Sequence, residues 1–167
     1  MRCLILLTLV AGCSAAPPPA DHPRTDLAPA PTAEMSLLAL ADGQDATLVE
    51  GAQGGFHVGL SYAVRGAAGS FTLERNARRV SDGAVVLRYR GAIDVGAPDA
   101  DGWWTVPSPI PMFMCPTPIG ISVVDEPIKL SLRLLDDADV ELARTEVTVV
   151  PRCPDAQRDF CTRICTG

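Results

Sequence analysis

The chain has 167 residues and carries 14 lysines and arginines against 20 aspartates and glutamates, a net charge of −6. An acidic chain is poorly suited to bind nucleic acid or an anionic membrane surface, because both attract basic patches. We therefore expect no nucleic-acid partner. The length allows one modest domain with its own core.

The first thirteen residues place one positive charge before a short apolar run and end in Val-Ala-Gly-Cys. The run is far shorter than the roughly 20 residues that a transmembrane helix needs. The final tetrapeptide resembles the lipobox of bacterial lipoproteins, in which the cysteine thiol receives a diacylglyceryl group and the chain is cut before it. This resemblance implies a signal peptide at residues 1–12 and a lipidated Cys13. The alternative is an ordinary secretory signal with a chance cysteine.

The segment after the cleavage site determines how the domain is held. In lipoproteins an Asp next to the lipidated cysteine often retains the protein in the inner membrane, so Ser14 favours export to the outer membrane. Residues 13–34 are rich in proline and alanine and offer little apolar surface. We expect this segment to be an extended tether between the membrane and a domain in the cell envelope.

Beyond residue 34 the chain changes to short apolar runs separated by Gly, Pro and Asp. The clearest are Ile128–Leu135 and 141–150, which alternate apolar and polar residues around an acidic turn. This pattern predicts an all-β fold, an immunoglobulin-like antiparallel β-sandwich at residues 35–151. The expected strands are residues 36–40, 46–50, 56–64, 70–73, 84–90, 102–106, 128–135 and 141–150. Prolines 107, 109 and 111 restrict the stretch before Cys115 to a sheet edge or an extended loop.

A glycine-rich stretch precedes the third expected strand. Gly51-Ala52-Gln53-Gly54-Gly55 superficially resembles a phosphate-binding loop, but it leads into a strand and not into a helix. We therefore expect a turn or bulge. The stretch from Leu48 to Val58 resembles a pattern, Gly-x-Gln-Gly-Gly-x-His-Val, that recurs in secreted lipoproteins of GC-rich Gram-negative bacteria. That family has no assigned activity. The resemblance implies an immunoglobulin-like fold and an envelope location, and it implies no catalytic residue.

His57 is the only histidine in the expected domain. It could bind a metal or contact a partner, or its ring could pack at a strand edge and bond the glycine-rich backbone. Met112, Met114 and Cys115 suggest copper(I), although no histidine follows Cys115, and apolar packing is the simpler expectation. Ser61 lacks the glycine pattern of a nucleophile elbow, which speaks against a hydrolase.

Two adjacent tryptophans, Trp103 and Trp104, form a candidate contact surface. Neighbouring residues of a strand point to opposite faces, so one ring should face the core and the other should be exposed or covered by a loop.

Six cysteines are present. Cys3 leaves with the signal and Cys13 is the lipid site, which leaves four in the exported domain: Cys115, Cys153, Cys161 and Cys165. An even number in an oxidising compartment predicts two disulfides, and a zinc site is the alternative. A short helix at residues 155–164 would place Cys161 and Cys165 one turn apart, which disfavours their pairing. We expect Cys153 to join one of them and Cys115 the other, while a bridge between Cys115 and Cys153 stays open. Residues 152–167 would then form a tail packed on the domain.

These observations favour a lipid-anchored module of the cell envelope that binds or scaffolds an envelope protein or polysaccharide and has no catalytic activity or cofactor. The alternative is a periplasmic copper or zinc protein that uses His57 with Met112 or Met114. An enzyme is the least favoured, because no convergent acid and base are apparent.

Overall fold

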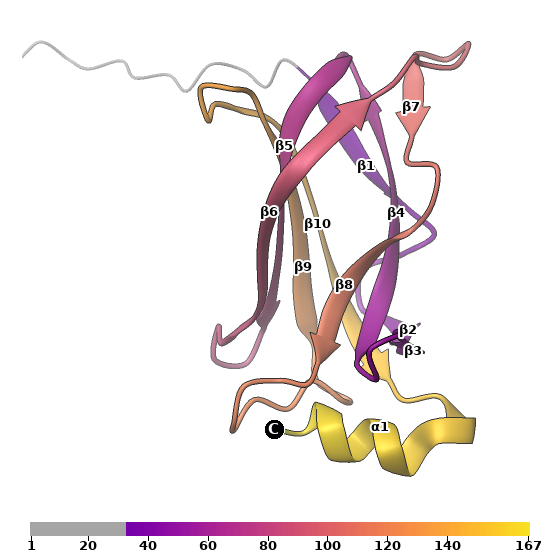
Figure 1. The fold of residues 1–167 in the computed structure, drawn as a ribbon, viewed down its shortest axis with the longest axis vertical. Coiled ribbons are helices and arrows are strands. Elements are labelled where there is room, and N and C mark those ends of the chain that lie inside the picture. The colour runs from indigo at the N-terminus through magenta and orange to yellow at the C-terminus, as the bar shows by residue number, and fades with distance from the viewer. Residues whose placement is uncertain (1–32) are drawn as a thin grey trace, which may run out of the picture.

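The computed structural model describes residues 33–167 (Figure 1). The expected signal peptide, Cys13 and nearly all of the expected tether lie outside these residues. The described elements are β1 (Glu34–Leu38), β2 (Gln44–Thr47), β3 (Val49–Glu50), β4 (Phe56–Arg65), β5 (Gly69–Arg79), β6 (Val85–Val95), β7 (Trp103–Thr105), β8 (Ile110–Cys115), β9 (Ile128–Leu135), β10 (Glu141–Arg152), the 3₁₀ turn Asp155–Gln157 and α1 (Arg158–Cys165).

Two five-stranded sheets form an immunoglobulin-like β-sandwich, as the sequence pattern predicts. In the first sheet the long strand β4 pairs with β1 and β3 along one edge and with β7 and β8 along the other. The second sheet has the order β2-β10-β9-β5-β6. Its strands are antiparallel except for β2, which runs parallel to β10.

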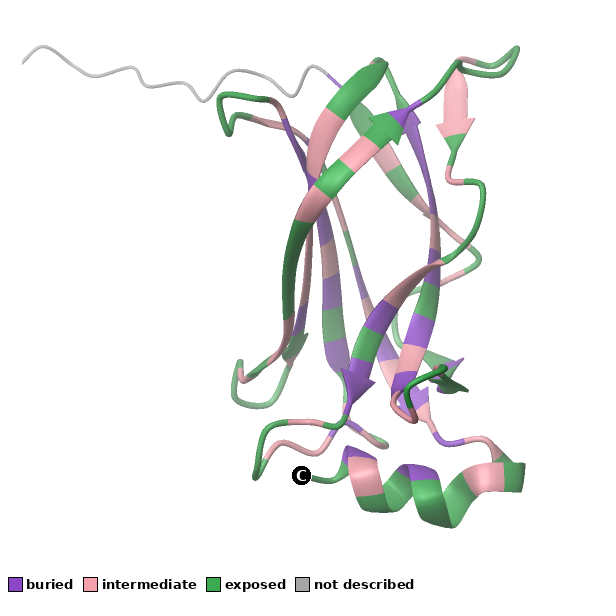
Figure 2. Ribbon diagram, viewed as in Figure 1, coloured by how far each residue is buried: buried purple, intermediate pink, exposed green. Residues whose placement is uncertain are grey.

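The core lies between the sheets, where the alternating apolar residues of facing strands meet. Leu130, Leu132 and Leu134 of β9 are fully buried, and so are Phe56, Leu60 and Tyr62 of β4. Figure 2 shows buried residues along the strands of both sheets and on α1. The hairpin of β9 and β10 has the alternation that its sequence predicts.

Several strand boundaries differ from the prediction, and the differences are informative. The expected strand 46–50 is two strands, since β2 belongs to the second sheet and β3 to the first. β5 runs six residues past the predicted end at residue 73, and β6 runs five past residue 90. Charged residues interrupt the apolar pattern there, but backbone pairing continues. The proline-bearing stretch forms β8, an edge strand that pairs only with β4 among the described strands.

The C-terminal tail closes one end of the sandwich. α1 lies across this end, and Cys161 and Cys165 on it are fully buried. Disulfides join Cys115 to Cys165 and Cys153 to Cys161. This is the favoured arrangement, in which Cys115 and Cys153 each bind one tail cysteine, and it rules out the pairing of Cys161 with Cys165. No helix among residues 33–167 is long and apolar enough to cross a bilayer.

Candidate binding cleft between the sheets

The glycine-rich stretch is a tight turn that connects β3 to β4, as its sequence predicts. The amide of Gly51 donates to the carbonyl of Gly55 at 2.7 Å, and the amide of Gly54 donates to the carbonyl of Gly51 at 2.9 Å. Gly54 has a φ of 78°, which glycine adopts without steric cost. The turn leads directly into strand β4, so it has no helix N-terminus to offer a phosphate.

Gly55 fixes this turn against the neighbouring strand. A Cβ atom at this position would lie 2.5 Å from the carbonyl oxygen of Cys115, a backbone atom that cannot move aside alone. Only glycine therefore allows the turn to touch the end of β8. Because Cys115 is also bonded to α1, the turn, β8 and the helix form one connected end of the molecule.

His57 faces away from the core, opposite Phe113 of β8 in the sheet register. The two ring centroids are 5.7 Å apart. The imidazole Nδ1 is buried and has no hydrogen-bond partner among the described residues. The expected bond to the glycine-rich backbone is therefore wrong for this nitrogen, because the ring packs toward Phe113. The expected position at a strand edge is wrong as well, because β4 is paired with β3 on one side of His57 and with β8 on the other.

Met112 and Met114 point the other way, into the core, where their exposed fractions are 0% and 1%. This confirms their role in apolar packing. Residues that alternate along a strand face opposite sides, so a ligand set of His57 with either methionine is not assembled. Cys115 is committed to a disulfide. Among residues 33–167 no group of three or more His, Cys, Asp or Glu is placed to hold a metal ion.

The two sheets leave a seam along one side of the sandwich, between the edge strands β6 and β8. Two cavities lie along it. The larger, of about 860 Å³, is next to the glycine turn and contains His57 and the half-exposed ring of Phe113. Its remaining wall residues come from the turn, from β6 and from the end of β8: Gly51, Ala52, Gln53, Gly55, Val86, Leu87, Pro111, Cys115 and Pro116.

The smaller cavity of about 310 Å³ lies farther along the seam, with mostly apolar walls. Trp104 and Tyr62 meet edge to face at its inner side, with ring centroids 6.3 Å apart. Trp103 points to the opposite face, where the guanidinium of Arg65 lies 4.8 Å from its ring centroid. The prediction that the two tryptophans divide between the faces is confirmed, and Trp104 is the one that packs on the core.

Arg75 lines the smaller cavity, a position that the sequence did not indicate. It lies on the core-facing side of β5, opposite the buried Leu132 of β9 and opposite Tyr89 of β6. Its guanidinium carbon is 3.9 Å from the Tyr89 ring centroid, and its side chain donates to the carbonyl of Pro111 in the other sheet at 3.0 Å. No ion pair between Arg75 and a carboxylate forms within the described part of the chain. If the strand is taken to continue past Leu73, the alternation of Phe71, Leu73, Arg75 and Ala77 places Arg75 on the core-facing side.

Tyr62 is the second unusual polar residue of the seam. Its side chain is fully buried and its hydroxyl has no hydrogen-bond partner among residues 33–167. Burial raises the pKa of Tyr62 to about 12, against the opposing effect of the nearby Arg75 charge. The hydroxyl therefore stays neutral over the physiological range.

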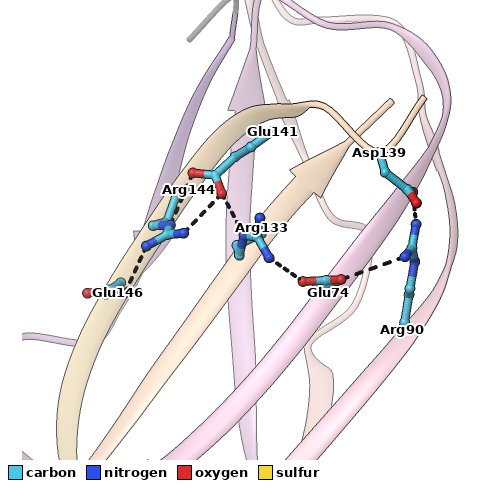
Figure 3. A network of polar contacts seen from close by, with 7 residues as sticks. All are labelled: Glu74, Arg90, Arg133, Asp139, Glu141, Arg144 and Glu146. Atoms are coloured by element: carbon cyan, nitrogen blue, oxygen red, sulfur yellow. Dashed lines mark hydrogen bonds and ion pairs between the residues drawn. The ribbon is translucent and has the colours of Figure 1, made fainter. Parts of the chain in front are cut away.

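The outer face of the second sheet has many charges, and seven charged residues of it form a network of hydrogen bonds and ion pairs (Figure 3). Arg133 bridges Glu74 at 2.7 Å and Glu141 at 2.5 Å. Burial alone would raise the pKa of Glu141, but hydrogen bonds from Arg144 and Arg133 outweigh it and hold the pKa below its usual range. The residues drawn are Glu74, Arg90, Arg133, Asp139, Glu141, Arg144 and Glu146, and Lys129 joins them through an ion pair with Glu146. The charges of this network balance one another.

No protein-family model matches the chain, and no curated protein matches it. Some solved structures resemble it over 71% of its length. One is assigned as a β-galactosidase from Bacteroides fragilis, with 13% identity and a TM-score of 0.38. Another is a β-glucuronidase from Bacteroides uniformis, with 11% identity and a TM-score of 0.36. The chain spans only 16% and 13% of these proteins, so the similarity assigns it no activity.

Proposed function

We propose that this chain is a lipid-anchored module of the bacterial cell envelope without catalytic activity, and that it binds an extended segment of an envelope protein along the seam. The observation that carries the proposal is the free edge of β6. This strand has eleven residues and pairs only with β5 among the described strands. Its second edge borders the larger cleft through Val86 and Leu87.

A free strand edge favours a protein partner over a polysaccharide. Its unpaired N–H and C=O groups repeat at the spacing of another extended chain, so a peptide can add to the sheet through main-chain hydrogen bonds. The cleft next to this edge offers apolar side chains and the ring of Phe113 to the side chains of such a peptide. β8 is the weaker template of the two edges, because Pro111 has no N–H.

The periplasmic metal protein is the weaker proposal. His57 and the two methionines face opposite sides of the sheet, so this candidate would need ligands other than the set the sequence suggested.

Photo-crosslinking in intact cells tests the partner. A benzophenone amino acid replaces Phe113, which is 50% exposed in the cleft, and in a matched control replaces Val140, which is 42% exposed in the β9–β10 turn. The proposal predicts a discrete protease-sensitive adduct at position 113 that is absent at position 140. Identical adducts at both positions, or an adduct removed only by glycan-degrading enzymes, would contradict it.

Fatty-acid labelling tests the anchor separately. Cys13→Ala should abolish incorporation of labelled palmitate and release the protein from membranes, because the thiol of Cys13 is the proposed acceptor. Cys3→Ala is the matched control, since this cysteine lies in the proposed signal peptide, and it should keep the label. Undiminished labelling of Cys13→Ala would refute the lipoprotein assignment.

A further inference from the structure

The smaller cavity of the seam contains two polar side chains that find no matching group within the described residues. The Tyr62 hydroxyl is buried without a partner. Arg75 has five N–H donors, of which one reaches the carbonyl of Pro111, and it forms no ion pair in residues 33–167. Asp94, the one acid that lines the cavity, is exposed and accepts a hydrogen bond from Ser70 instead.

Buried polar groups without partners destabilise a folded domain. A buried hydroxyl without a partner destabilises the folded state, and natural proteins pair nearly all such groups. A phenylalanine at position 62 and an aliphatic residue at position 75 would fit the apolar stripes on which these residues lie. A donor and a cation that line a mostly apolar cavity are instead the arrangement that an anionic ligand requires.

The shape and chemistry of the cavity define the ligand further. Ile93, Ile110 and Leu73 supply apolar walls, and the rings of Tyr89 and Trp104 also line it. Its volume of about 310 Å³ is near the lower limit of small-molecule pockets, which accommodates one ring or a short chain. Apolar walls disfavour inorganic phosphate and free sugars, which have no apolar surface of this extent.

We propose that this cavity binds a small carboxylic acid, with the carboxylate accepting hydrogen bonds from Arg75 and Tyr62 and the apolar body lying between Tyr89 and Trp104. The planar guanidinium suits a carboxylate because two parallel N–H groups can donate to its two oxygens. This site is separate from the larger cleft and does not depend on the proposed envelope partner.

Tryptophan fluorescence of the full chain in detergent gives a local measurement. The chain has two tryptophans, so Trp103→Phe leaves Trp104 as the only one, inside the cavity. Phenylacetate is the probe and phenylacetamide its uncharged counterpart. The proposal predicts a saturable change in Trp104 emission, with phenylacetate binding at least about tenfold more tightly than the amide, because only the acid can pair with Arg75.

Variants of the two polar residues locate the site. Arg75→Gln should weaken phenylacetate binding about tenfold or more, whereas the exposed Arg78→Gln on the same strand should leave it unchanged. Tyr62→Phe removes a single oxygen atom from the core, so it should fold with equal or higher Tm while binding phenylacetate several-fold more weakly. It remains informative even where Arg75→Gln fails to fold.

Three results would overturn the proposal: no saturable response to phenylacetate, equal affinity for the acid and the amide, or unchanged affinity in folded Arg75→Gln or Tyr62→Phe. The first would show that the cavity does not bind a small aromatic acid, and the second that it selects only apolar bulk. The third would place the bound acid elsewhere.

Discussion

Arginine side chains on the outer face of the second sheet and in the seam between the sheets have different kinds of partner. On the outer face Arg133 bridges two glutamates, and its neighbours extend the network. In the seam Arg75 faces the core from the adjacent strand and pairs with a backbone carbonyl and an aromatic ring. The charges of the outer network are paired within the chain, whereas the inner charge has capacity left for another molecule. The number of charges on a surface is therefore a poorer guide to a binding site than how completely they are paired.

The largest expected effect concerns the stability of the sandwich to which both regions belong. Replacing Cys115 and Cys165 with alanine should lower the free energy of unfolding by about 2–5 kcal/mol, because the bridge restricts the unfolded chain. Its partners are 50 residues apart, against 8 for Cys153 and Cys161, so loop entropy predicts that the longer bridge contributes roughly 1–2 kcal/mol more. Denaturant unfolding of the two paired alanine variants measures both values. Equal losses would show that loop entropy does not dominate.

The next effect is a loss of stability at high pH that we expect a residue of the seam, Tyr62, to cause. Tyr62 has a pKa raised to about 12, so between pH 10 and 12 the unfolded chain loses a proton that the folded chain keeps, and stability falls as pH rises. The loss should be about 2 kcal/mol at pH 12. Tyr62→Phe should remove this loss and raise stability at neutral pH by about 1 kcal/mol.

The chain has two tyrosines, which makes Tyr89→Phe the matched control for this experiment. Tyr89 is half exposed, so its substitution should leave the alkaline slope in place. Chemical unfolding at pH 7, 10 and 11.5 measures all three proteins. An alkaline slope that persists in Tyr62→Phe would assign it to another group.

A smaller effect compares the two arginines directly. Arg133→Met should destabilise the domain by about 1 kcal/mol, because it leaves Glu74 and Glu141 facing each other without a cation. Arg75→Met should cost less or stabilise slightly, because methionine fits the apolar stripe and no carboxylate is left unpaired. Paired thermal melts test the ranking. A greater cost at Arg75 would mean that its bond to Pro111 holds the two sheets together, and the contrast between the regions would fail.

The smallest effect concerns an exposed turn outside both regions. A hydrogen bond from Arg79 lowers the pKa of Asp82 to about 2, with help from the backbone amide of Ala84. Its stabilising contribution is therefore present above the usual carboxyl pKa and is lost as pH falls toward 2. Asp82→Asn should make the Tm slightly less sensitive to acid between pH 4 and 2. An unchanged dependence of Tm on pH would show that ionisation of Asp82 does not contribute to the stability of the fold.

The sequence predicted the sandwich and the disulfides because both depend on local patterns. The alternation in 128–135 and the even number of cysteines after Cys13 can be read without knowledge of distant contacts. The polar groups of the seam could not be predicted in the same way, because β5 appeared to end at Leu73 where charged residues begin. Tyr62 could be placed on a buried strand from its pattern. Its lack of a partner depends on which side chains the opposite sheet brings near it.

The register of β1 shows at which end of the sandwich the described part of the chain begins. Glu34 pairs with Arg65 at one end of β4, while Phe56 at the other end pairs with Cys115 beside α1. Ten strand residues separate these ends by roughly 30 Å. With an anchor at Cys13, the chain would enter the domain at the end nearer the bilayer and point α1 and the glycine turn into the aqueous compartment. The larger cleft would then be presented well away from the lipid, within reach of proteins that never touch the membrane.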